Sequence, residues 1–257
     1  MTQTIRNYKD DPALVAKVEK GLELPFQWNP KTTTLAQALE ESRRFWQNPD
    51  GGAMPKGFVD ALNRSLAELV QAGLEKHSVK VGQKFPAFIL PNQTGQLIRS
   101  EDLNRAGPLV VTFYRGGWCP YCNLALRGMQ RVLPDIERLG GRLVAVTPEQ
   151  PDDSLSTAEK AGLTFDVLTD DGLGYARQLG IVWKIPDYAL QWHEQYFGLH
   201  FEQHNGVGHR DELPVPATFV VDRKGVVAWR FLEAAYWKRA DPKDVVEAVR
   251  RLTTRSE

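Results

Sequence analysis

The two cysteines of the chain, Cys119 and Cys122, lie three residues apart and are the only thiols among its 257 residues. Two cysteines cannot form the disulfide framework of a chain this long. In a reducing compartment such a pair is more often catalytic, redox-sensing or metal-binding than structural. The pair follows an apolar run at residues 109–114 and a glycine turn, which predicts a strand, a turn and then a helix.

Pro120 suits the first position of that helix, which makes Cys119 the residue that caps its N-terminus. The sulfur of Cys119 would then face the free N–H groups and the positive end of the helix dipole. Both effects favour the thiolate, so we expect the pKa of Cys119 to be lowered. Cys122 would lie one turn further on, shielded but close enough to attack an oxidised Cys119.

Metal binding is the alternative use of such a pair. A structural zinc needs about four protein ligands, and the pair supplies two. The remaining candidates are His193, His200, His204 and His209. Pro120 and the strand–turn–helix setting favour redox chemistry instead, and the histidines are interpreted as surface or pocket residues.

The pattern from about residue 79 onward predicts the elements that must position the pair. Short apolar runs alternate with helical patterns, and a final helix starts at Asp241 and Pro242. The strands are expected at residues 109–114, 143–146, 165–168, 217–221 and 226–231, the last two joined by a hairpin turn at residues 222–225. This order predicts an α/β fold, a mixed central sheet flanked by helices.

Residues 1–78 are interpreted as a helical N-terminal extension and residues 79–257 as the main domain. Three amphipathic helical patterns occupy the extension, with breaks at residues 25–30 and 48–52. The extension either covers the main domain or forms a homodimer interface. A segment rich in aromatic residues and histidine, residues 184–214, interrupts the main domain. We hypothesise that it walls the active-site cleft; the alternative is a helical insertion whose aromatics are core.

The charge of the chain is balanced, with 32 basic and 32 acidic residues. A neutral chain offers no electrostatic case for binding nucleic acid or an anionic membrane. The first residues contain no apolar stretch of the secretory type, and no run approaches the length of a membrane span. These features predict a soluble, cytoplasmic protein.

Three stretches resemble the peroxiredoxin-like proteins of the alkyl hydroperoxide reductase / thiol-specific antioxidant family, within the thioredoxin-fold superfamily. They are FYRGGWCPYCNLALR at residues 113–127, STAEKAGLTFDVLTD at 156–170 and LPVPATFVVDRKGVV at 213–227. The resemblance covers some two-thirds of the chain. It implies a thioredoxin-like fold for the main domain.

The resemblance also implies a reaction with hydroperoxides. Cys119 would attack the peroxide and become a sulfenic acid, and Cys122 would resolve it to a disulfide. Thioredoxin, glutathione or another thiol donor would reduce that disulfide, and no bound cofactor is implied. In the superfamily a proline, usually cis, precedes the strand that faces the redox cysteine. Pro216 takes this place, where it would offer the backbone of Val215 to a bound partner.

The chain departs from the peroxiredoxin pattern at two positions. Gly116 stands where a threonine or serine precedes the peroxidatic cysteine, and Pro216 stands where an arginine precedes the Ala-Thr-Phe strand. Arg115 or Arg127 is expected to supply the missing cation, unless each is only a surface charge. Trp118 is expected to shield Cys119 from solvent.

Two other functions stay open from the sequence. One is thiol–disulfide exchange without a peroxide step, because the Cys-Pro-Tyr-Cys tetrapeptide also matches glutaredoxins. The strand before the pair carries Thr112 where thioredoxins carry a buried acid, which weakens a plain thioredoxin role. The other is a metal-binding or redox-sensing interaction protein that contacts a partner through its helical extension.

Overall fold

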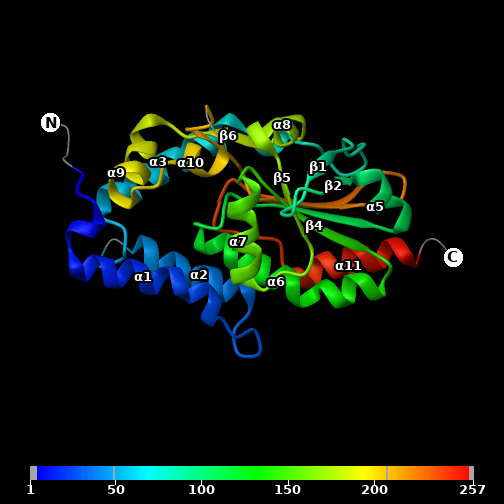
Figure 1. Cartoon of the computed structure of the whole chain (residues 1–257), viewed down its shortest axis with the longest axis horizontal. Coiled ribbons are helices and arrows are strands. Elements are labelled where there is room, and N and C mark those ends of the chain that lie inside the picture. The colour runs from blue at the N-terminus through cyan, green and yellow to red at the C-terminus, as the bar shows by residue number, and fades with distance from the viewer. Residues whose placement is uncertain (1–4, 49, 207, 255–257) are drawn as a thin grey trace.

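A five-stranded sheet forms the centre of the computed structural model, which describes residues 5–48, 50–206 and 208–254 (Figure 1). β3 (Leu109–Phe113) pairs in parallel with β4 (Arg142–Thr147), and β4 with β5 (Asp166–Thr169), whereas β8 (Ala217–Val221) runs antiparallel to β3 and to β9 (Val227–Leu232). The predicted mixed α/β sheet is therefore confirmed. In spatial order the strands are β5, β4, β3, β8 and β9.

The predicted hairpin between β8 and β9 is also confirmed. The side chain of Asp222 accepts the N–H groups of Lys224 and Val226, which closes the turn. Gly225 adopts a φ of 71°, a left-handed conformation that glycine reaches without steric conflict.

Helices cover both faces of the sheet. α6 (Pro120–Arg138) and α11 (Pro242–Thr253) pack against each other and lie below the sheet in Figure 1. Because side chains alternate along a strand, Val110 of β3 joins the core on that side and Val111 the core on the other. The shorter elements are β1 (Ile89–Pro91), β2 (Leu97–Arg99), α5 (Ser100–Ala106), α7 (Pro151–Ala161), η2 (Asp171–Leu173) and α8 (Gly174–Gln178).

The N-terminal region is helical, as expected. α1 and α2 pack on α6, whereas α3 packs on α9 of the insertion, so the extension spans from the helix of the cysteines to the insertion. α1 continues through Pro25 and ends at Gln27, so the break expected at residues 25–30 lies within that range but begins after Pro25, which removes one N–H donor from the helix. The elements are η1 (Tyr8–Asp10), α1 (Pro12–Gln27), α2 (Leu35–Gln47), α3 (Lys56–Ala72) and α4 (Leu74–His77).

The insertion begins at the end of β6 (Val182–Lys184) and contains α9 (Asp187–Phe197), α10 (Phe201–Asn205) and β7 (Glu212–Pro214). β6 and β7 pair antiparallel, which draws the two ends of the segment together. Most of its aromatics are core residues: Trp192 stacks on Phe58 of α3 at 5.6 Å between ring centroids. No helix of the described residues is both long and apolar enough to cross a membrane.

Candidate active site

The cysteine pair lies where the chain leaves β3 and enters α6. Cys119 is the N-cap residue of α6 and Pro120 its first residue, so the predicted strand–turn–helix arrangement is confirmed. Both thiols are free, with Cys119 1% exposed and Cys122 fully buried. Neither thiol is exposed, so the expected contrast between an exposed Cys119 and a shielded Cys122 is not found. The two differ instead in that the sulfur of Cys119 borders a cavity.

Cys122 lies against a cation. Nη2 of Arg239, from the loop before α11, is 3.1 Å from its Sγ, and the backbone N–H of Arg115 is 3.5 Å away. Burial works against a thiolate here, but the hydrogen bond from Cys119, Arg239 and the Arg115 N–H outweigh it and hold the pKa of Cys122 well below its usual value.

Cys119 shows the opposite shift from the one expected. Burial raises the pKa of the Cys119 thiol well above its usual value, and its hydrogen bond to Cys122 adds to the rise. The expectation of a lowered pKa at Cys119 is thus wrong for the reduced pair. The side chain of Cys119 makes no capping hydrogen bond, so no helix N–H group offsets the effect of burial through a direct bond. The pair holds one negative charge most stably on Cys122.

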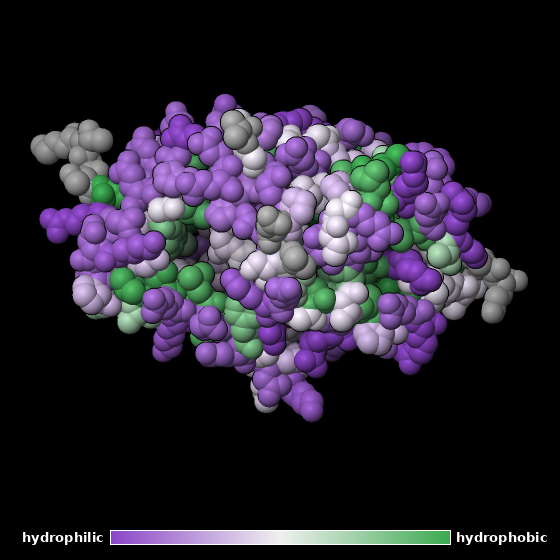
Figure 2. Space-filling view, in the orientation of Figure 1, coloured by the Kyte–Doolittle hydropathy of each residue, from purple (hydrophilic) through white to green (hydrophobic). Residues whose placement is uncertain are grey.

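A cavity of about 200 Å³ borders Cys119, and Cys122 does not line it. Cys119, Arg115 and Trp118 contribute to its wall from the redox loop. The N-terminal extension and the insertion supply most of the rest, which is largely apolar: Tyr8, Val18, Leu22, Trp46, Met54, Leu62, Phe197 and Leu199. Figure 2 shows hydrophobic surface gathered over the α1 side of the molecule. We call this space the Cys119 cavity.

Arg115 is a buried cation at this cavity. It is 8% exposed, and its guanidinium lies 4.9 Å from the ring centroids of both Trp118 and Tyr236. Within residues 5–48, 50–206 and 208–254, no hydrogen bond or ion pair engages its guanidinium. Aromatic faces stabilise a cation only in part, so five N–H donors remain available to an anion or oxygen in the cavity.

Val215 and Pro216 do not line the Cys119 cavity. They border a neighbouring cavity of about 50 Å³, which shares Arg115 and His193 with the first. The expected cis bond at Pro216 is wrong, because the described residues contain no cis peptide bond. Val215 and Pro216 are the two residues that connect β7 to β8. The N–H of Val215 is also taken, since it donates to the carbonyl of Ile181 at 2.7 Å.

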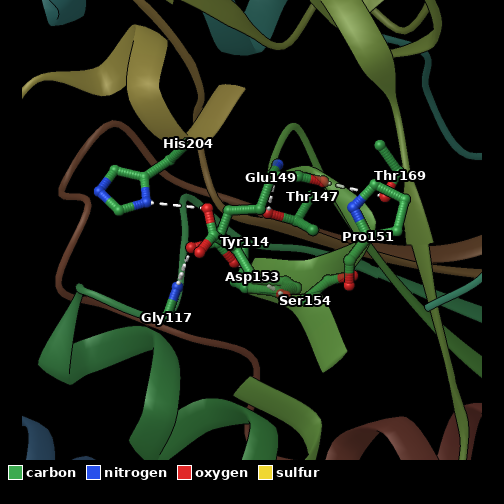
Figure 3. A network of polar contacts seen from close by, with 9 residues as sticks. All are labelled: Tyr114, Gly117, Thr147, Glu149, Pro151, Asp153, Ser154, Thr169 and His204. Atoms are coloured by element: carbon green, nitrogen blue, oxygen red, sulfur yellow. Dashed lines mark hydrogen bonds and ion pairs between the residues drawn. The ribbon is translucent and has the colours of Figure 1, made fainter. Parts of the chain in front are cut away.

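Glu149 is a functional candidate that the sequence analysis missed. It follows β4, is 2% exposed, and its Oε1 accepts the N–H of Gly117 at 2.8 Å (Figure 3). The hydroxyl of Tyr114 lies 3.4 Å from its other oxygen. Burial raises the pKa of the Glu149 carboxyl to about 7, although the Gly117 N–H opposes the rise. The carboxyl thus anchors the loop that carries Cys119.

The same loop explains the departure at position 116. A Cβ on Gly116 would lie 2.2 Å from Nε1 of Trp118 and 2.9 Å from Oε1 of Glu149. No hydroxyl-bearing side chain fits there without displacing both groups. A polar partner for the substrate must therefore come from another element.

The other candidates lie elsewhere. Arg127 lies over the ring of Phe26 and borders neither the Cys119 cavity nor the neighbouring one. The hydroxyl of Thr112 forms a hydrogen bond with that of Thr218 across the sheet. His204 pairs with Asp153 (Figure 3). Within the part of the chain that the structure describes, no group of three His, Cys, Asp or Glu residues has the geometry of a metal site, so the proposed ligand set does not assemble.

Glu149 and Arg239, the two residues that the sequence did not predict, differ in whether a sequence pattern indicates them. Glu149 follows a strand that runs parallel to β3, and residues at the carboxyl ends of neighbouring parallel strands meet at one edge. That rule could have found it. Arg239 lies 117 residues from Cys122 in a loop, and nothing local marks it.

Solved structures share this fold. Peroxidoxin BcpB from Mycobacterium tuberculosis has a TM-score of 0.54 and 19% sequence identity, covering 68% of this chain and 98% of that chain. Peroxiredoxin 6 of Arenicola marina has a TM-score of 0.55 and 15% identity, covering 70% and 76%. Such low identities show the fold alone, which confirms the expected thioredoxin-like architecture.

Sequence relatives include peroxidases and an exchange protein. Peroxiredoxin Bcp of Escherichia coli (strain K12) is 25% identical over 103 residues, 40% of this chain and 65% of that protein. Thiol-disulfide oxidoreductase ResA of Geobacillus thermodenitrificans is 29% identical over 154 residues, 60% of this chain and 70% of that protein. The match to Bcp therefore spans slightly less than two thirds of the relative.

The family model described as the AhpC/TSA family matches residues 81–230, more than half of the chain. The match includes the cysteine pair, Glu149, the insertion and the hairpin. The chain belongs to the AhpC/TSA family.

Proposed function

We propose that this protein is a thiol peroxidase that reduces hydroperoxides with Cys119 as the attacking residue. The observation that carries the proposal is the Cys119 cavity, where a cysteine and the unpaired cation of Arg115 border one space. Peroxiredoxin relatives support the reaction class. Trp118 holds Arg115 at the cavity, which fits the substrate-binding role expected for both residues.

The first step forms a sulfenic acid. Cys119 gives up its thiol proton, and its sulfur attacks the oxygen of R–O–O–H that bears the hydrogen. The O–O bond breaks, its electron pair leaves with RO⁻, and that group takes up a proton and departs as ROH. Arg115 stabilises the negative charge that develops on the leaving oxygen. The hydrogen bond between the thiols lets Cys119 pass its proton to Cys122 as it reacts.

The second step closes the disulfide. Cys122 loses its proton and attacks the sulfur of the Cys119 sulfenic acid, and the hydroxyl leaves with a proton as water. Arg239 favours this step because it stabilises the Cys122 thiolate. A thiol donor such as thioredoxin or glutathione then returns two electrons to the disulfide, and no bound cofactor enters the cycle.

Thiol–disulfide exchange is the second candidate. The favouring observation is the hydrogen-bonded dithiol with its charge on Cys122, which suits an exchange couple. The ResA relative carries the name of that activity. The burial of Cys119 limits every protein partner alike, a disulfide substrate or a thioredoxin donor, because a protein reaches a sulfur that is 1% exposed only after local opening. A hydroperoxide or glutathione is small enough to use the cavity, so burial argues against protein disulfides as the oxidant.

Stopped-flow tryptophan fluorescence distinguishes the two functions, because Trp118 lies beside Cys119. The reduced protein is mixed with hydrogen peroxide, an organic hydroperoxide or oxidised glutathione. A peroxidase gives a fast signal that scales with peroxide concentration and that Cys119→Ser abolishes. Cys122→Ser should retain a first phase that is slower, because the proton acceptor is removed, and should form no disulfide. A response to oxidised glutathione alone would identify an exchange enzyme instead.

A further inference from the structure

His193 of α9 is a buried polar residue to which the two chemical steps assign no part. It is 6% exposed and borders both the Cys119 cavity and the neighbouring cavity, each time together with Arg115. Its ring lies edge-on to Phe58 with 5.0 Å between centroids, and 5.2 Å from Phe201. These contacts hold the imidazole in one orientation.

The hydrogen bond of His193 assigns its tautomer. Nδ1 lies 3.0 Å from the carbonyl oxygen of Ala189, and a carbonyl oxygen can only accept. Nδ1 therefore carries the proton, and Nε2 of the neutral ring carries a lone pair. Burial and the nearby Arg115 lower the pKa of His193 to about 3, which keeps the ring neutral. No described residue forms a hydrogen bond with Nε2.

A hydroperoxide in this cavity needs such an acceptor. Its O–H group loses its hydrogen bonds to water on entering an apolar space, which is unfavourable unless a protein acceptor replaces them. Position 116 cannot hold a hydroxyl side chain. The hydroxyl oxygens of Tyr121 and Tyr236 already accept from the amide of Gln47. Nε2 of His193 and the hydroxyl of Tyr8 are thus acceptors at the cavity that no described residue engages, and of the two only His193 borders both cavities together with Arg115.

Resting on the proposed peroxidase function, we propose that Nε2 of His193 accepts the O–H of the bound hydroperoxide and orients it for attack by Cys119. The oxygen attacked keeps its hydrogen and becomes the hydroxyl of the sulfenic acid, so His193 gains and loses no proton in the step. Arg115 stabilises the negative charge on the other oxygen, which leaves as ROH. The two residues together do the work that the hydroxyl residue and arginine of the peroxiredoxin pattern would do.

Two variants that differ in reach test this role. Gln at 193 can place its Oε1 near the position of Nε2, whereas the shorter Asn reaches only the position of Nδ1. We expect His193→Asn to lower the second-order rate constant for hydroperoxide about tenfold, and His193→Gln to recover most of it. His193→Phe, which packs between Phe58 and Phe201 without an acceptor, should behave as His193→Asn does.

Alkylation of Cys119 by iodoacetamide, measured in the same variants with Cys122 replaced by serine, is the control, because this reagent brings no O–H to bind. Its rate should stay within about twofold of the parent. Equal loss of both rates would mean that His193 only supports the structure, and unchanged peroxide rates would also overturn the proposal. A wild-type protein that does not react with peroxide at all would instead refute the peroxidase function itself.

Discussion

Glu149 shows how one buried side chain couples the redox loop to pH. Burial removes its carboxyl from water and disfavours the ionised form. The carboxyl still accepts a hydrogen bond from the N–H of Gly117, two residues before Cys119. The folded-state pKa of about 7 lies above the ordinary value of 4.5. The stability that Glu149 contributes is therefore fully present below pH 4.5 and is lost as the pH rises through 7.

Glu149→Gln should remove this pH dependence, because the amide stays neutral while its Oε1 still accepts the Gly117 N–H. Between pH 5 and pH 8 the free energy of unfolding should fall less in the variant than in the wild type, by about 2.5 kcal/mol. Urea unfolding at the two pH values measures it. Glu159→Gln on the exposed side of α7 is the matched control, and an equal pH dependence in wild type and Glu149→Gln would contradict the prediction.

Among the secondary-structure elements, α3 of the extension and α9 of the insertion contribute to the wall of the Cys119 cavity. α3 contributes Leu62, which borders both cavities, and Leu66 one turn later, which borders only the neighbouring one. α9 contributes His193 and Phe197. The insertion therefore borders the cavity, as hypothesised, although most of its aromatics pack in the core. On the proposed peroxidase function, we infer that these helices determine which peroxides fit.

Leu62→Phe should narrow the Cys119 cavity and shift its substrate preference. We expect the rate with a bulky aryl hydroperoxide to fall about tenfold relative to the rate with hydrogen peroxide, since added volume in an apolar pocket discriminates on this scale. Leu66→Phe on the same helix should leave the ratio unchanged. The measurement is the rate of each variant with the aryl hydroperoxide and with hydrogen peroxide. If Leu62→Phe keeps the wild-type ratio of the two rates, the cavity does not select the substrate.

At the scale of the whole molecule, the extension and the insertion cover the redox centre. α1 and α2 pack on the helix of the cysteines, and α3 on α9, so the extension covers its own domain. These contacts fit the covering role, and the homodimer role and the boundary at residue 78 stay predictions. Small reagents can use the cavity, whereas large ones require local opening.

Thiol labelling should report that coverage. We expect a maleimide on a long polyethylene glycol chain to react with the native protein at least about tenfold more slowly than iodoacetamide, each rate being divided by its own rate in denaturing urea. Urea below the unfolding transition should accelerate the large reagent more. Equal normalised rates would mean that the cysteines are open to macromolecules, and would favour exchange with protein disulfides.

Local signals were reliable where a few neighbouring residues decide the structure. Pro120 after an apolar strand was enough to place Cys119 at the start of α6, and residues 222–225 were enough to place the hairpin. Asp241 and Pro242 placed the start of α11 in the same way. Such signals work because caps and turns satisfy backbone groups within a few residues.

The electrostatics of the site were not predictable in this way. The direction of the cysteine pKa shifts depends on burial and on Arg239, which comes from a loop far along the chain. The acceptor at the cavity comes from α9, and the loop anchor from the end of β4. None of these residues stands at a fixed spacing from Cys119 and Cys122.

The redox pair, the alternation of strands and helices and the family resemblance could be predicted from the amino-acid sequence, because these depend on residue type and on short-range order. The packed chain was needed to show which sulfur holds the charge, that Pro216 is trans, and that Arg115 and His193 face one cavity. Burial and long-range contact set those properties, and both arise only when segments distant in the chain are packed together.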